Sequence, residues 1–280
     1  PRGSNSLPAG MNLSAGISVV QNKWRVVEVD KNSDLQHRPE IEPFVIESVT
    51  VRETEDTKEP VRIGFSAMAI PLSRGEIDYA ENLSKTIGMT PVDQEVIPPP
   101  TADYTPFATK LKDAGPNWVY SWAPWVTQVR TLEALRKLGW QDDYIAWGHL
   151  EAEAELARLK DGKFYVVNSN ALFQEKQPIH QDIEAAASKA GSKFPAQTMT
   201  EGWIGGMAIE AALKGAGWPA DPAKVRAAME NLKIDTKGLR GGPIEWTKDN
   251  HFRTRLYYRV YKWDGDKIAR VQDWKTYEVK

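Results

Sequence analysis

Residues 98–121, PPPTADYTPFATKLKDAGPNWVYS, constrain the fold more than any other stretch of the chain. The three consecutive prolines fix φ and lack backbone donors, so neither a helix nor a central strand can include them. A helix must begin after them, with Thr105 expected as the N-cap and Pro106 in the first helical position. Gly115, followed by proline, is a typical helix stop, and the aromatic and aliphatic run that begins at Trp118 predicts a strand.

The helix expected within this stretch is amphipathic. Phe107, Leu111 and Ala114 recur at steps of three and four residues, which places them on one face. A second helix is expected at about 126–138 and is closed by Gly139. Helices that alternate with strands predict a parallel sheet flanked by helices, with ligands bound at the carboxyl ends of its strands.

The same alternation continues through most of the chain. Strands are expected at 61–69, 92–97, 143–148 and 163–169, and helices at 76–88, 151–159, 179–191, 200–217 and 221–233. The last three helices follow one another without a strand between them. Residues 242–279 read as closing strands, with Asp264 and Gly265 in a tight hairpin turn.

The N-terminal part has a different character. PRGS resembles the remnant of a thrombin cleavage linker, so residues 1–10 are left out of the fold expectations. Residues 11–60 are expected to be an atypical β-rich segment, with a hairpin at 16–30 and a third strand at 43–53. Polar and charged sequence, typical of loops and linkers, surrounds these strands.

Composition excludes several classes of function. The chain has 280 residues, of which 41% are hydrophobic and 26% charged, as expected for a globular protein with a substantial core. Its formal net charge of −2 gives no electrostatic reason to expect a nucleic acid partner, and no apolar run is long enough to span a membrane. Cysteine is absent, which removes thiol catalysis, cysteine zinc sites and disulfides. We expect no cofactor and no metal.

From Val61 to Lys280 the chain resembles the latter part of the branched-chain amino acid (Leu/Ile/Val) binding proteins, the type I periplasmic solute receptors of ABC importers. The resemblance is carried by six segments in the order and spacing of that family: ADYTPFATKLKDAGPNWVY, VTQVRTLEALRKLGW, YIAWG, TEGWIGGMAIEAAL, GPIEWTKDNH and YYRVYKWDGDKI. It implies a periplasmic-binding-protein-like fold of type I. It also implies a receptor that captures a small organic solute, works with a membrane ABC permease and is located in the periplasm or outside the cell. No signal peptide is recognisable in the chain.

The resemblance also implies how the domains are divided. Residues 61–170 with 235–280 correspond to the second lobe of such receptors, and residues 171–234 to helices of the first lobe. Family members begin with further β-α units that build most of the first lobe, and residues 1–60 do not resemble them. Without that sheet the three helices would expose apolar faces. Either the β segment of residues 15–53, a missing lobe segment or a second chain is expected to cover them.

Loops after the strands are expected to form one wall of the ligand cleft. By position the ligand-binding candidates are the following: Ser66, Ser121, Trp122, Trp125, His149, Glu151 and Trp203. The serines are expected to hydrogen-bond the polar part of the ligand. Trp122 and Trp125 are expected to stack on its apolar part, as the high tryptophan count of 11 would suit. Trp203 has the alternative reading of plain core packing.

The candidate residues bear on the kind of ligand. Amino-acid-binding relatives hold the ammonium group with a tyrosine in the first loop and an acid after the fourth strand. Here the first loop, AMAIPLSRGE, has no tyrosine, and the acid is offset to Glu151. An amino acid is therefore one of several options, beside an amide or an aromatic or aliphatic carboxylate.

The sequence supports an enzymatic function less well than it supports ligand binding. His149 and Glu151 are two residues apart and would point apart on a helix, so they do not form an acid–base pair, and no catalytic residue is assigned. We therefore predict a protein that is not an enzyme. Two alternatives stay open at this point: a carbohydrate-active enzyme with paired carboxylates and aromatic platforms, and an interaction or sensor domain without a ligand.

Overall fold

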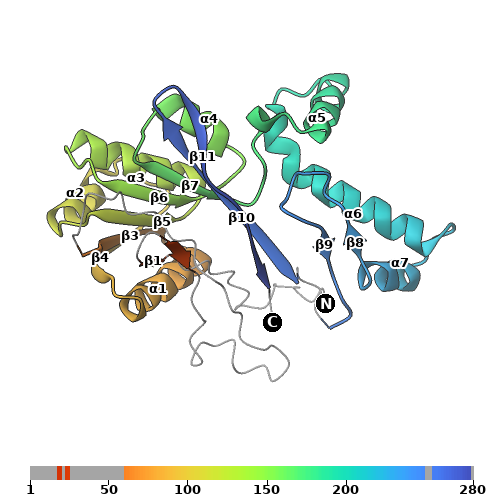
Figure 1. Ribbon diagram of the computed structural model, residues 1–280, viewed down its shortest axis with the longest axis horizontal. Coiled ribbons are helices and arrows are strands. Elements are labelled where there is room, and N and C mark those ends of the chain that lie inside the picture. Colours follow the sequence, from red (N-terminus) through yellow and green to blue (C-terminus); the bar gives the residue numbers. More distant parts are fainter. Residues whose placement is uncertain (1–17, 21–22, 26–59, 250–253, 279–280) are drawn as a thin grey trace. The chain divides into compact units, whose positions relative to one another are not determined.

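The computed structural model describes residues 18–20, 23–25, 60–249 and 254–278 (Figure 1). The described part of the chain divides into two compact units, one that ends at residue 146 and one that begins at residue 147. Each unit is described by itself. The third strand expected at 43–53 lies outside the described residues. The division into lobes at 171–234 stays a prediction.

The first unit alternates strands and helices. Its elements are β1 (Ser18–Val20), β2 (Lys23–Arg25), β3 (Arg62–Met68), α1 (Pro71–Thr86), β4 (Thr90–Ile97), α2 (Thr105–Asp113), β5 (Trp118–Trp122), α3 (Trp125–Lys137) and β6 (Asp143–Trp147). β3 pairs in parallel with β4 and with β5, and β5 pairs in parallel with β6. The predicted parallel sheet is therefore confirmed for these four strands. β1 and β2 pair antiparallel, as the predicted N-terminal hairpin requires.

The helix boundaries follow the prolines and glycines, with two differences from the prediction. α2 begins at Thr105 itself, and the carboxylate of Asp103, at 2.9 Å, accepts the Thr105 N–H; Thr105 is therefore not the N-cap. α1 begins at Pro71, five residues before the expected start, because a proline is well suited to the first turn of a helix. The loop between β3 and α1 is consequently very short.

The second unit combines an antiparallel sheet with a group of helices. Its elements are α4 (Ala152–Leu159), β7 (Phe164–Asn168), the 3₁₀ turns η2 (Phe173–Glu175) and η3 (Ala196–Met199), α5 (Pro178–Lys189), α6 (Thr200–Ala216), α7 (Pro222–Met229), β8 (Lys233–Ile234), β9 (Ile244–Glu245), β10 (Arg255–Asp264) and β11 (Lys267–Glu278). β10 pairs antiparallel with both β7 and β11. β10 and β11 form the long hairpin coloured blue in Figure 1, and Gly265 at its turn has φ +67°, as predicted.

The helices of the second unit have their own apolar core. It is built from isoleucine, leucine and alanine side chains of α5, α6 and the segment 232–244: Ile179, Ile183, Ile204, Ala208, Leu232, Ile234, Leu239 and Ile244. Partly buried residues, Trp203 among them, pack around this core. The buried core residues of α6, Ile204 and Ala208, lie on one side of the helix.

Candidate ligand-binding site

Ser66 and Ser121 lie on neighbouring strands near the carboxyl ends of β3 and β5. They are register partners, and neither is exposed to solvent. The Ser121 hydroxyl lies 3.4 Å from the Ser66 carbonyl oxygen and 3.5 Å from the Ser66 Oγ. The phenol of Tyr144 is also buried here and donates to the Gln128 carbonyl at 2.8 Å. Burial raises the pKa of Tyr144, which therefore remains a neutral hydrogen-bond donor.

The connection after β3 is held by Ser73, on the first turn of α1. Its buried hydroxyl accepts the Met68 N–H at 3.0 Å and donates to the Trp122 carbonyl. One side chain thus links the carboxyl ends of β3 and β5. Burying a hydroxyl is favourable only when it is paired in this way. The sequence pattern predicts a loop at Ser73, whereas the structure places it on α1; Pro71, two residues before it, is the local signal that a helix begins there.

Trp122 and Trp125 bracket the turn from β5 to α3. Trp125 is the first residue of α3 and is almost entirely buried. Trp122 is the last residue of β5 and is only half-buried. The Nε1 atom of Trp122 is buried and has no hydrogen-bond partner within the part of the chain that the structure describes. An unpaired buried N–H group disfavours folding by about 1–3 kcal/mol, so an acceptor brought by a ligand would be stabilised there.

His149 and Glu151 belong to the second unit and precede α4. His149 is half-buried, and its carbonyl accepts the Ala152 N–H at 3.1 Å. Glu151 is exposed directly before the helix, and its carbonyl accepts the Glu155 N–H at 3.0 Å. Both residues therefore take part in starting α4. Their role toward a ligand stays a prediction.

Trp203 lies on α6, where it packs against the apolar core of the second unit and also lines a pocket of about 700 Å³. The core-packing reading and the pocket reading are therefore compatible. Charged and sulfur-containing side chains border the same pocket: Asp182, Met199, Met207, Glu210 and Lys237. Of these lining residues only Trp203 is a candidate from the sequence, because the pocket is formed by three separate segments of the chain.

The described residues contain no group of three or more histidine, aspartate or glutamate side chains placed to hold a metal ion. No described helix is both long enough and apolar enough to cross a membrane.

The sequence model of the periplasmic binding protein family matches residues 53–267, and the chain belongs to this family. The match confirms the family resemblance and the type I periplasmic-binding fold class. The family consists of ligand binders that are not enzymes, which agrees with the prediction that the chain is not an enzyme. It also places the chain in a class of periplasmic or extracellular proteins.

Solved structures with a similar fold are binding proteins of ABC transporters. A branched-chain amino acid ABC transporter protein from Thermus thermophilus, with bound valine, is 17% identical with a TM-score of 0.66, over 78% of this chain and 61% of that one. A solute-binding protein from R. palustris in complex with 4-hydroxybenzoate is 16% identical with a TM-score of 0.61, over 79% and 61%. A fatty acid ABC transporter substrate-binding protein from Thermomonospora curvata is 14% identical with a TM-score of 0.63, over 78% and 58%.

These similarities show the fold. The chain spans about three fifths of the length of the solved structures it resembles. No curated protein sequence matches it.

Proposed function

We propose that this chain captures a small organic solute for an ABC importer, with Trp122 as a principal contact. The observation that carries the proposal is the Trp122 side chain, half-buried at the carboxyl end of β5 with a buried N–H group that has no acceptor among the described residues. An aromatic face beside an unpaired donor suits a ligand that is apolar at one end and carries a carboxylate or carbonyl at the other. Family membership supports a ligand-binding role.

The candidate solutes are amino acids, amides and aromatic or aliphatic carboxylates. The solved relatives carry valine or 4-hydroxybenzoate, or are described as fatty acid binding proteins. All of these ligands have a carboxylate, which is the acceptor that the Trp122 N–H would bind most strongly. Ser121, which directly precedes Trp122, and its register partner Ser66 are both fully buried. We expect them to support the strand ends, with direct ligand contact left to Trp122.

The test is a thermal-shift and tryptophan-fluorescence screen against branched-chain and aromatic amino acids, 4-hydroxybenzoate, a fatty acid, short amides and sugars. A saturable increase in Tm with one class of solute is expected, because a ligand that binds only the native state stabilises it. Trp122→Ala should abolish the shift. Trp122→Phe keeps a ring but lacks the N–H, and should weaken binding about tenfold.

Trp263→Ala is the matched control, since Trp263 is also a half-buried tryptophan but lies near the β10–β11 turn. It should leave the solute shift unchanged. A cooperatively melting protein that responds to none of these solutes would contradict the proposal and favour an interaction or sensor role. A shift that survives Trp122→Ala would support a receptor but remove Trp122 from its site.

A further inference from the structure

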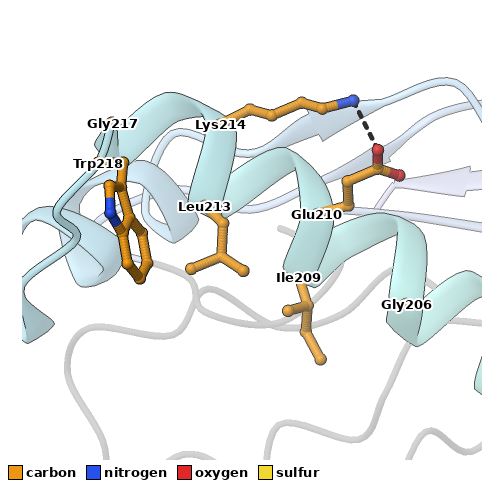
Figure 2. Close-up of a pocket in the computed structure, with 7 residues that line it drawn as sticks. All are labelled: Gly206, Ile209, Glu210, Leu213, Lys214, Gly217 and Trp218. Atoms are coloured by element: carbon orange, nitrogen blue, oxygen red, sulfur yellow. Dashed lines mark ion pairs between the residues drawn. The ribbon is translucent and has the colours of Figure 1, made fainter.

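The helical group of the second unit, residues 176–246, has an apolar core that it does not share with the strands β7, β10 and β11. The described members of this core come from η2, α5, η3, α6 and residues 232–246, and none of them comes from those three strands. Figure 2 shows Ile209 and Leu213 projecting together from α6, where they are exposed and line a depression of about 580 Å³. The position of the helical group against the sheet therefore depends on contacts other than a common core.

One such contact involves the connecting segment 169–175, which leads from β7 into the helical group. The first part of this segment is bound by the helical group itself. The Ala171 N–H donates to the Leu239 carbonyl at 2.9 Å, and the Arg240 guanidinium donates to the Ser169 carbonyl at 3.2 Å. Leu239 and Arg240 both belong to the loop between β8 and β9. This β8–β9 loop is therefore fixed to the beginning of the connecting segment.

The second part of the connecting segment is bound by α4 and by the β10–β11 hairpin. Glu153 on α4 accepts the N–H groups of the first two residues of η2, at 2.6 and 2.8 Å. Glu175, the last residue of η2, accepts a hydrogen bond from the Tyr261 hydroxyl and forms an ion pair with Arg259. Both of these partners lie on β10. The connecting segment is thus held by the helical group at its beginning and by the hairpin at its end.

Arg259 has a buried guanidinium with three partners. Its side chain is only 7% exposed, and it binds the carboxylate of Glu175 and, at 2.8 Å, that of Asp273. The Trp274 ring lies over the guanidinium, with 4.1 Å between Cζ and the ring centroid. A buried charge is strongly disfavoured when it loses its partners. The guanidinium therefore holds Glu175 and Trp274 in place together.

Trp274 extends this arrangement to the β8–β9 loop. A Cβ atom added at Gly241 would lie 2.8 Å from the Trp274 ring, and one added at Gly242 would lie 2.6 Å from the Tyr257 ring. Neither glycine has a φ in the left-handed region, so it is the close approach of the two rings that requires glycine at these positions. Arg259 therefore acts on the connecting segment through Glu175 and on the β8–β9 loop through Trp274.

From these contacts we infer that Arg259 is a conformational lock between the helical group and the β10–β11 hairpin. While its guanidinium is paired with Glu175 and covered by Trp274, the connecting segment and the β8–β9 loop are both fixed to the hairpin. When the ion pair opens, both are released together, and the helical group turns about the connecting segment as a hinge. Arg259 is thus a positioning residue.

The lock has a consequence for solute capture, which rests on the proposed function. The ligand candidate Trp203 lies on α6 in the helical group, whereas Glu151 directly precedes α4. Because Glu153 on α4 and Arg259 on β10 hold the same connecting segment, the lock sets the distance between these two candidates.

Amide hydrogen exchange of the full chain, measured by mass spectrometry without any solute, tests the lock. Amides at 171–174 and at 239–240 are hydrogen-bonded, so their exchange reports local opening. Glu175→Gln removes the counter-charge in the connecting segment, and Gly241→Ala displaces the Trp274 ring. Each variant should accelerate exchange at least about tenfold in both places, because Arg259 couples them. Exchange within α6 at 204–212 should stay at the wild-type rate. Arg259→Gln should give the same pattern.

Arg270→Gln is the matched control. Arg270 lies on the same hairpin and faces the carboxylates of Glu175 and Asp273, but at 3.7 and 3.6 Å and with 46% of its side chain exposed, so exchange should remain unchanged. Faster exchange only in the segment that carries the substitution would overturn the lock. An equal acceleration within α6 would overturn it too, because it indicates a general loss of stability. Coupled exchange in a protein that responds to no solute would support the lock and contradict the proposed function alone.

Discussion

At the scale of single residues, His180 is a buried titratable group with a defined environment. It is 2% exposed, it stacks on Phe173 with ring centroids 4.3 Å apart, and its Nδ1 accepts the Gln177 N–H at 3.2 Å. Its Nε2 has no partner among the described residues. Burial lowers the pKa of His180 below 6.5, although the charges of Glu175 and Glu184 act in the opposite direction. The native state therefore prefers the neutral ring.

This environment predicts a pH dependence of stability. When the native pKa lies below the unfolded value, the unfolded state binds the proton first as the pH falls below about 6.5. The free energy of unfolding should therefore decrease between neutral and mildly acidic pH, and His180→Gln should reduce that decrease. Urea titrations at several pH values measure it. His149→Gln, at a half-buried histidine, is the control, and an unchanged pH profile for His180→Gln would contradict the prediction.

At the scale of elements, an ion pair between a buried arginine and a partly exposed glutamate connects three segments of the second unit. Arg240 is 5% exposed and binds both carboxylate oxygens of Glu201 on α6, at 2.7 and 2.9 Å. It also donates to the Ser169 carbonyl, just after β7, at 3.2 Å, and Asn170 donates to Glu201 at 2.9 Å. The start of α6 is thereby tied to the segment after β7 and to the loop after β8.

Breaking this ion pair should be strongly destabilising. Glu201→Gln leaves the buried guanidinium without its counter-charge, and we expect a loss of about 2 kcal/mol in the free energy of unfolding, since the partly exposed glutamate moderates the larger penalty of a fully buried pair. Glu155→Gln removes the charged partner of the exposed Arg158 and should change stability by less than about 0.5 kcal/mol. Urea unfolding compares the two variants. Equal losses in the free energy of unfolding for the two variants would show that the folded state does not need Glu201 as the counter-charge of Arg240.

At the scale of the whole molecule, the proposed capture of a solute predicts a Tm that depends on solute concentration. A ligand that binds only the native state stabilises it by mass action, so the Tm should rise as the concentration of the bound solute increases. Calorimetry at several solute concentrations measures this. A Tm that stays constant with every candidate solute would count against a receptor.

The order of helices and strands was predictable from the residues that begin and end them. Gly115 and Gly139 close α2 and α3 with φ of +69° and +84°, and Gly265 turns the β10–β11 hairpin. These positions need a backbone conformation that glycine adopts without strain, so the signal is local and visible in the sequence. The start of α1 was missed because Pro71 suits a helix start as well as a loop.

The candidate site was less predictable. Ser66 and Ser121 were chosen because they end strands, but whether a strand-end side chain faces solvent depends on what lies above it. The structure buries both serines against each other and near Tyr144, and it leaves Trp122 as the half-exposed group. The link from Ser73 to the Trp122 carbonyl joins residues 49 positions apart, a separation over which sequence patterns carry no signal.

The sequence by itself determined the α/β architecture and the absence of cysteine chemistry, because periodicity, turn residues and composition act locally. The family followed from the resemblance of particular segments between Val61 and Lys280. Only the tertiary structure decided which polar groups pair across distant segments, as the buried Arg240 and the partly exposed Glu201 do, and which side of α6 packs into the core of the second unit. Burial is a property of neighbours that are distant in sequence. The sequence of a helix therefore does not distinguish an apolar residue that packs into a core from one that is exposed to solvent, as Leu213 is.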